Sequence, residues 1–139
     1  MPETRWVLVA EDDDNDFALI ERSVRKLDID VELRRAANGQ IAIQLLEEAI
    51  HTQPFLVMLD VKMPKVSGLE VLHAIRQNPA TQHLPAVMLT SSDESADLHE
   101  AYRLGCNAYL RKPILYAEFV DTVKCTLLFW LQVRIPDGT

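Results

Sequence analysis

The stretch LVAEDDDNDF, from Leu8 to Phe17, joins an apolar segment directly to a run of carboxylates. The apolar segment covers residues 6–10 without a polar interruption, which predicts a strand buried on both faces, as in the centre of a parallel sheet. Ligands of open α/β sheets bind at the carboxyl ends of such strands. Glu11 and Asp12 follow this strand immediately and are therefore candidate site residues. The later acids of the run are expected to be solvated or to favour a helix N-terminus: Asp13, Asp14 and Asp16.

Four further short apolar segments occur at residues 33–37, 55–59, 85–89 and 108–111, separated by segments with helical periodicity. This alternation predicts a parallel sheet with helices on both faces. The 33–37 segment, LRRAA, is the more polar one and is expected at an edge of the sheet. Right-handed crossovers and short loops favour the strand order 2-1-3-4-5, so we expect an α/β, flavodoxin-like fold with a doubly wound (βα)5 five-stranded parallel sheet.

Apolar residues recur on one face of each intervening segment. Helices are therefore expected at about residues 17–27, 42–50, 68–76 and 115–131. A further helix is expected after Thr90, opened by a capping box of Ser91 and Glu94 and ended by Gly105.

Three carboxylates are predicted to converge, because the first and third strands are neighbours in this order. Glu11 and Asp12 follow the first strand and Asp60 follows the third. Their repulsion would be costly unless a cation neutralises them or one of them takes up a proton. Oxygen ligands suit Mg²⁺ better than Zn²⁺, which prefers His or Cys. Thr90 and Lys112 end two further strands and add a hydroxyl and an ammonium group. The combination predicts phosphoryl transfer onto Asp60, with Thr90 and Lys112 in catalytic roles.

Four motifs, VLVAEDD, MLDVKMPKVSG, AVMLTSS and GCNAYLRKP, resemble the receiver domain of two-component response regulators over nearly the whole chain. The resemblance implies Mg²⁺ as cofactor and a phosphoryl group received from a sensor histidine kinase. It also implies a signalling protein rather than an enzyme, one that promotes only its own phosphorylation and dephosphorylation and signals through its surface. The implied residue roles are phosphorylation of Asp60, metal binding by Glu11, Asp12, Asp60 and the main-chain carbonyl of Lys62, switching by Thr90 and Tyr109, and a structural role for Pro113 after a cis Lys112–Pro113 bond.

The side chain of Lys62 has two interpretations. It is either an ordinary surface lysine or an ammonium group that crowds the water that would hydrolyse an acyl phosphate. The second interpretation predicts a long-lived phosphorylated form.

The ending LLFWLQVRIP resembles the C-terminal extension of single-domain response regulators that work with bacterial phytochromes, as does the acid-rich opening. The resemblance implies a phytochrome as the kinase. A receiver domain is expected at residues 1–132 and a C-terminal extension at 133–139. Because only a short tail follows the fifth helix, no attached output domain is expected. The resemblance also implies a homodimer through the fifth strand, the fifth helix and the extension, against the alternative of a tail folded on its own core. Surplus apolar residues on the fifth helix are the candidate dimer interface: Leu128, Phe129 and Leu131.

Length and charge exclude several classes of function. A chain of 139 residues fits one domain, and a formal net charge of −7 disfavours binding to nucleic acid. No apolar run is long enough for a membrane span and no signal peptide is evident, so we expect a cytoplasmic protein without a membrane partner. Cys106 and Cys125 lack metal-ligand spacing and each has apolar residues close by on both sides, so they are expected as buried, reduced thiols.

Three rival functions fit the sequence less well. A phosphatase of the aspartyl-phosphate type needs a second Asp two positions after the nucleophile, where this chain has Lys62. A flavin-binding module needs a phosphate loop after the first strand, where these carboxylates would repel the phosphate. A pseudo-receiver that binds partners without phosphorylation would not need all five of the predicted site groups.

Overall fold

Five strands and five helices alternate along residues 5–135, the part of the chain that the computed structural model describes. The strands are β1 (Arg5–Ala10), β2 (Val31–Ala36), β3 (Leu56–Leu59), β4 (Ala86–Thr90) and β5 (Ala108–Arg111). The helices are α1 (Asp14–Arg25), α2 (Gly39–Glu48), α3 (Gly68–Gln77), α4 (Ser95–Leu104) and α5 (Tyr116–Gln132). All paired strands are parallel and their order is β2-β1-β3-β4-β5, which confirms the predicted fold.

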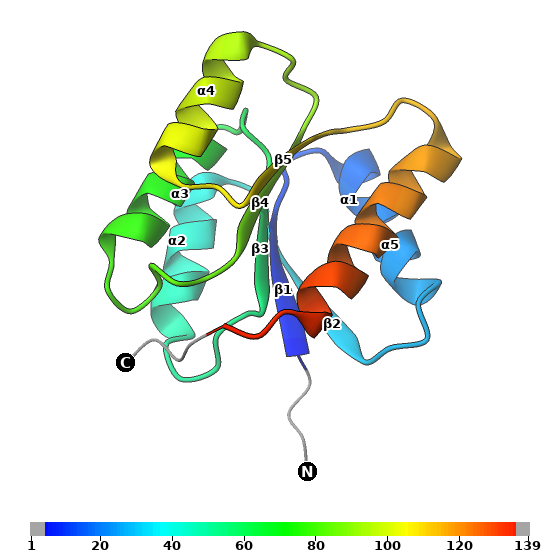
Figure 1. The fold of residues 1–139 in the computed structure, drawn as a ribbon, viewed down its shortest axis with the longest axis horizontal. Helices are drawn as coiled ribbons and strands as arrows, with labels where there is room; N and C mark the ends of the chain where they lie inside the picture. Colours follow the sequence, from blue (N-terminus) through cyan, green and yellow to red (C-terminus); the bar gives the residue numbers. More distant parts are fainter. Residues whose placement is uncertain (1–4, 136–139) are drawn as a thin grey trace.

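Two hydrophobic cores lie on the two faces of the sheet, because successive side chains of a strand point to opposite faces. In β1, Leu8 and Ala10 belong to the core beneath α2, α3 and α4. Val7 and Val9 belong to the core beneath α1 and α5. Figure 1 shows the sheet edge-on with α2, α3 and α4 on one side and α1 and α5 on the other. The unbroken apolar character of the central strands follows from burial on both faces.

Helix α4 begins differently from the prediction, and the capping box of Ser91 and Glu94 was wrong. The helix starts at Ser95 with Glu94 as N-cap, and no side chain caps it. In the loop before α4, Ser92 makes two hydrogen bonds. Its backbone N–H donates to the Thr90 hydroxyl, and its own hydroxyl donates to Asp97. The helix ends as predicted, at Gly105 in the left-handed conformation with φ of 99°.

No helix among residues 5–135 combines the length and apolar character that crossing a membrane requires. The described part of the C-terminal segment stops at residue 135, so most of the predicted extension at 133–139 lies outside the described residues. Both cysteines are free thiols, and Cys106 is buried as predicted. The predicted burial of Cys125 was wrong, because this residue lies on an exposed position of α5.

Candidate metal and phosphoacceptor site

The carboxylates predicted to converge are brought together at the carboxyl edge of the sheet. Ala10 of β1 pairs with Leu59 of β3, so the residues that follow these strands are adjacent. Glu11, Asp12 and Asp60 each offer an oxygen, and these oxygens all lie within 4.8 Å of one another. Glu11 and Asp60 are buried while Asp12 is exposed, so the cluster is open to solvent on one side.

The donor set fits a hard divalent cation. It consists of carboxylate oxygens, with no His or Cys in the cluster among the described residues, which favours Mg²⁺-like ions over Zn²⁺. The backbone N–H of Lys62 lies 3.4 Å from an Asp60 carboxylate oxygen, so the loop after β3 turns directly beside this group. An open cavity of about 570 Å³ reaches the cluster and is lined in part by Asp12, Lys62 and Asp97.

Lys112 supplies the positive charge of the site. Its ammonium nitrogen lies 2.6 Å from Glu11, 2.7 Å from Asp16 and 2.8 Å from Asp60, and its side chain is 6% exposed. The backbone N–H of Lys112 donates to the carbonyl of Thr90, which continues the pairing of β4 and β5 up to the site. Desolvation opposes the charge of Lys112, but hydrogen bonds to the carboxylates outweigh it and raise its pKa.

The burial of Glu11 raises its pKa. Loss of hydration raises the pKa of Glu11 to about 7, and the nearby Asp60 charge adds to this effect, while the Lys112 ammonium opposes it. A cation at the cluster would therefore compete with a proton near neutral pH.

Asp16 has a position that the sequence analysis missed. Asp13 caps α1 by accepting a hydrogen bond from the Asp16 backbone N–H at 2.9 Å, which agrees with the expected capping. The Asp16 side chain, however, turns into the site and accepts a hydrogen bond from Lys112. Asp16 lies three residues after the N-cap Asp13, and this spacing predicts a position near the strand ends. It does not predict Lys112 as the partner of Asp16.

Arg35 of β2 was also missed. Its guanidinium donates to the main-chain carbonyl of Glu11 at 3.0 Å and pairs with Asp14 at 2.8 Å. Arg35 thereby fixes the backbone at the end of β1. Asp14 remains at the surface, with its side chain 91% exposed, as expected.

The two predicted switch residues share a partner in Ser92. Thr90 ends β4 almost fully buried, and its hydroxyl accepts from the Ser92 backbone N–H at 3.1 Å. Tyr109 of β5 donates its hydroxyl to the Ser92 carbonyl at 3.1 Å. The loop after β4 therefore connects Thr90, at the carboxyl end of β4, to Tyr109 of β5 through Ser92.

Lys62 and Pro113 complete the predicted set. The Lys62 side chain is 64% exposed and its ammonium lies 2.8 Å from Glu94 in the loop before α4. No peptide bond among the described residues is cis, so the expected cis Lys112–Pro113 bond was wrong. The trans form is the one that X–Pro bonds favour intrinsically, by about 0.5–1 kcal/mol.

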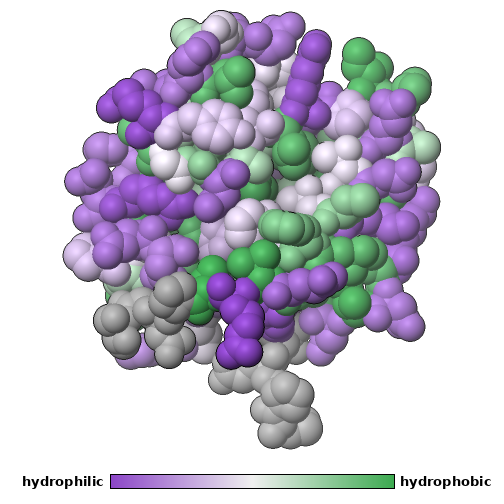
Figure 2. All heavy atoms as spheres, in the orientation of Figure 1, coloured by the Kyte–Doolittle hydropathy of each residue, from purple (hydrophilic) through white to green (hydrophobic). Residues whose placement is uncertain are grey.

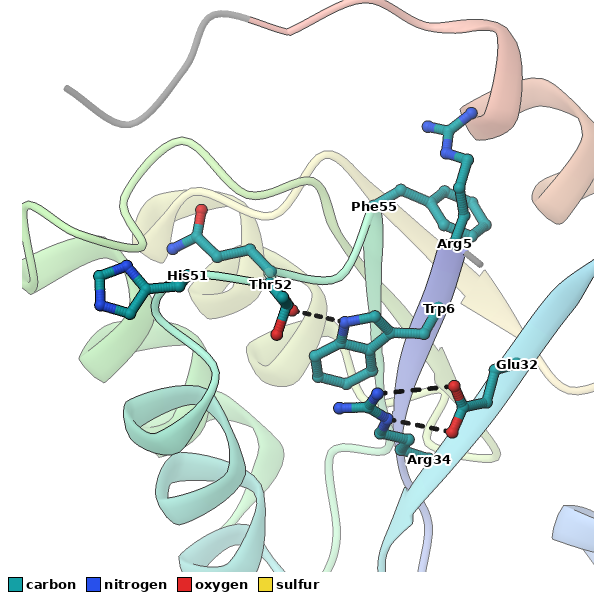
Figure 3. A pocket seen from close by; sticks show the side chains of 8 residues that line it. Arg5, Trp6, Glu32, Arg34, His51, Thr52 and Phe55 are labelled. Carbon is teal, nitrogen blue, oxygen red and sulfur yellow. Dashed lines mark hydrogen bonds and ion pairs between the residues drawn. The ribbon is translucent and has the colours of Figure 1, made fainter. Parts of the chain in front are cut away.

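Another cavity, of about 480 Å³, lies at the opposite, amino edge of the sheet (Figure 3). Two contacts join residues that line it: Arg34 pairs with Glu32, and the Trp6 indole N–H donates to the Thr52 carbonyl. Arg5 donates to the Leu131 carbonyl of α5. These contacts tie the starts of β1 and β2 to their surroundings, and we assign no function to this cavity.

Comparison with known proteins identifies the family. A model of the response regulator receiver domain matches residues 7–124. Response regulator Rcp1 of Synechocystis sp. is 33% identical over 135 residues, which cover 94% of this chain and 92% of Rcp1. The crystal structure of the Mn²⁺-bound form of Rcp1 matches with a TM-score of 0.87 at 32% identity, covering 95% of this chain and 99% of that one. The crystal structure of the phosphorylated cyanobacterial phytochrome response regulator RcpA matches with a TM-score of 0.91 at 27% identity, covering 97% and 100%. This chain therefore belongs to the family of response regulator receiver domains.

Proposed function

We propose that this receiver domain accepts a phosphoryl group on Asp60 from a sensor histidine kinase and signals through a change in its surface. The observation that carries the proposal is the meeting of Asp60 with Glu11, Asp12 and Lys112 at the carboxyl edge of the sheet. The family match supports this function over an aspartyl-phosphate phosphatase, as does Lys62 where that class needs a second Asp.

The reaction is an in-line displacement at phosphorus. An Asp60 carboxylate oxygen attacks the phosphorus of the phosphohistidine, the new O–P bond forms as the P–N bond breaks, and the electron pair of that bond stays on the imidazole nitrogen. Lys112 neutralises charge on the phosphoryl oxygens, and the Thr90 hydroxyl at the end of β4 donates to another of them. Mg²⁺ held by Glu11, Asp12, Asp60 and the Lys62 carbonyl would supply further positive charge for these oxygens.

The output is carried by the loop after β4. A phosphoryl group adds about 1.5 to 2 negative charges at neutral pH. Drawing the Thr90 hydroxyl toward that charge disturbs its hydrogen bond with the Ser92 backbone N–H. The Ser92 carbonyl also accepts a hydrogen bond from the Tyr109 hydroxyl, so this second bond is disturbed as well. Tyr109 is then released to turn inward, which shifts the surface formed by β4, α4 and β5 between two states.

The kinase donor is proposed to be a phytochrome. Support comes from the likeness to RcpA, whose structure is described as that of a phosphorylated cyanobacterial phytochrome response regulator. The likeness covers 97% of this chain and 100% of RcpA.

A homodimer through β5, α5 and the C-terminal extension is proposed from the outer face of α5. Leu128 is 39% exposed, Phe129 is 59% exposed and Ile135 just beyond the helix is 38% exposed. Figure 2 shows apolar side chains gathered over the region where Figure 1 places the C-terminal half of α5. Leu131, also predicted for this interface, is partly buried against the core beneath α1 and α5 and contributes less exposed surface. Such apolar surface favours a second copy of this chain as its cover.

The function is tested by incubating the protein with acetyl phosphate and Mg²⁺ and measuring its intact mass. The expected result is a gain of one phosphoryl group that is absent in Asp60→Asn and absent when the divalent ion is chelated. An unchanged mass in the wild-type protein would exclude the proposed function, and a gain that persists in Asp60→Asn would exclude Asp60 as the acceptor.

A further inference from the structure

The ammonium group of Lys112 has as many carboxylate partners as it has N–H bonds to donate. An ammonium group carries three N–H donors and no acceptor. Glu11, Asp16 and Asp60 each place an oxygen between 2.6 and 2.8 Å from its nitrogen. Because the Lys112 side chain is 6% exposed, water has little access to these donors. The orientation of the ammonium group is therefore set by the three carboxylates.

The three partners differ in what a cation would do to them. Glu11 and Asp60 belong to the oxygen cluster that fits a divalent ion, and Asp16 does not. A cation bound at the cluster would share the charge of Glu11 and Asp60, and a phosphoryl group on Asp60 would convert that carboxylate into an acyl phosphate. Asp16 alone of the three would keep its full charge for Lys112 throughout the reaction.

The position of Asp16 is fixed by α1 and not by the cluster. It lies in the first turn of α1, where its backbone N–H donates to the Asp13 side chain at 2.9 Å. Its side chain is 27% exposed, compared with 91% for Asp14 in the same turn. Asp14 pairs with Arg35 instead, so two acids of one helical turn hold two different cations. A general preference of acids for the helix N-terminus does not explain the inward direction of Asp16.

We propose that Asp16 is the positioning residue of Lys112. It holds the ammonium group from the α1 side so that one N–H remains directed at the Asp60 oxygen, and then at the phosphoryl group, after a divalent ion has taken charge from Glu11 and Asp60. This inference rests on the proposed phosphorylation of Asp60. Asp16 itself does not touch the transferring group.

The test is a double-mutant cycle on the rate of phosphorylation by acetyl phosphate at saturating Mg²⁺. Asp16→Asn is expected to lower the rate by about ten- to a hundredfold, since a small misplacement of a charge-neutralising group can have that effect. Asp16→Glu, which keeps the carboxylate, is expected to retain most of the rate. In a Lys112→Ala background, Asp16→Asn is expected to cause no further loss, because the residue acts only through the lysine. Equal losses in both backgrounds, or no loss in the wild-type background, would overturn the inference.

The matched control is Asp14→Asn, which removes the same charge from the same helical turn and is expected to leave the rate unchanged. An equal loss in Asp14→Asn would show a general effect of charge and would contradict the inference. If the wild-type protein gains no phosphoryl group at all, the proposed function fails before the role of Asp16 is reached.

A second measurement keeps the role of Asp16 testable even if the Lys112→Ala variant does not fold. In the ¹⁵N–¹H spectrum of side-chain ammonium groups, a held Lys112 signal is expected in the metal-free wild-type protein and again after Mg²⁺ is added. In Asp16→Asn, this signal is expected to disappear on addition of Mg²⁺. A signal that persists equally in the variant would overturn the inference independently of any phosphorylation.

Discussion

Glu11 combines deep burial with a position as a candidate metal ligand, and this predicts that ion binding depends on pH. Its pKa is raised from the ordinary value of 4.5 to about 7, first by loss of hydration. A group with a pKa of about 7 is mostly protonated at about pH 6 and mostly ionised at about pH 8, a change of about tenfold in the ionised fraction. We therefore expect the Kd for Mg²⁺ to be about tenfold larger at about pH 6 than at about pH 8.

Isothermal titration calorimetry of the metal-free protein measures this dependence. Glu11→Gln is the control, because it cannot titrate and is expected to bind Mg²⁺ more weakly with little change over the same range. A constant Kd for the wild-type protein between these pH values would show that Glu11 is already ionised and that its proton does not compete with the ion.

Lys62 is expected to lengthen the life of the phosphorylated form. Its ammonium group, 2.8 Å from Glu94, bridges the loops after β3 and β4 beside the cavity that reaches the cluster. Lys62→Ala removes the ammonium group and opens the cavity to water, so dephosphorylation is expected to become faster. The expected change is modest, on the order of threefold, because the Lys62–Glu94 ion pair is exposed. Loss of the phosphoryl group is followed by intact mass after the donor is removed.

Glu94→Gln is expected to act in the same direction as Lys62→Ala, since it breaks the same bridge. Lys65→Ala removes a lysine from the same loop and is expected to have no effect. A half-life unchanged in Lys62→Ala would leave Lys62 as an ordinary surface lysine.

Individual residues were predictable from the sequence where a strand end fixes them. Glu11, Asp12 and Asp60 follow strands that are buried at their carboxyl ends, so their meeting depends only on strand order. The contact between Asp16 and Lys112 joins residues 96 positions apart and depends on how α1 docks against the sheet. No local pattern encodes that docking, and the acid-rich run offers several equivalent candidates.

At the scale of elements, the start of α3 sets the position of the phosphoacceptor. Gly68 is the first residue of α3, and a Cβ added there would lie 1.9 Å from the main-chain carbonyl oxygen of Asp60. The Gly68 backbone N–H also donates to the Val61 carbonyl at 2.9 Å. Only a residue without a side chain allows α3 to begin this close to the end of β3.

Gly68→Ala is therefore expected to lower the free energy of unfolding by about 1–3 kcal/mol and to slow phosphorylation, because the end of β3 must move. Urea unfolding and the acetyl phosphate reaction measure the two effects. Gly105→Ala is the control: its φ of 99° is also unfavourable for alanine, but it lies at the amino edge of the sheet. We expect it to lose stability and keep the rate. An unchanged rate in Gly68→Ala would show that α3 does not position Asp60.

Elements were predicted well where burial is complete and poorly where a loop competes with a helix. The central strands are apolar on both faces, and their predicted ranges agree with the structure to within a residue or two. The predicted capping box at the start of α4 was wrong because the helix begins at Ser95 with Glu94 as N-cap, so Ser91 lies three residues before the capping position. Polar residues in the loop before a helix can thus resemble a helix cap in the sequence.

At the scale of the whole molecule, topology followed from general rules of chain connection. Parallel strands joined by right-handed crossovers leave few orders for five strands, and the order β2-β1-β3-β4-β5 places β1 and β3 together. No comparable rule predicts whether the molecule associates with a second copy, because association depends on which apolar surface residues a partner covers.

The proposed homodimer is tested with Phe129→Glu, which places a charge on the outer face of α5. Phe129 is 59% exposed, so the fold is expected to be unaffected while the interface is lost. Light scattering at micromolar concentration, with and without acetyl phosphate, is expected to give a dimeric mass for the wild-type protein and a monomeric mass for the variant. Ile50→Glu, at an exposed position beyond α2, is the control and is expected to remain dimeric. A monomeric wild-type protein in both conditions would remove the dimer from the account.

Locating the phosphoryl group along the chain tests the central claim most directly. Reduction with borohydride converts an aspartyl phosphate into homoserine, which tandem mass spectrometry assigns to one position. After incubation with acetyl phosphate and Mg²⁺, we predict homoserine at position 60 and at no other acidic residue of the chain. Homoserine at Asp12 or at another acid, or none at all in a protein that binds Mg²⁺, would contradict the role of Asp60.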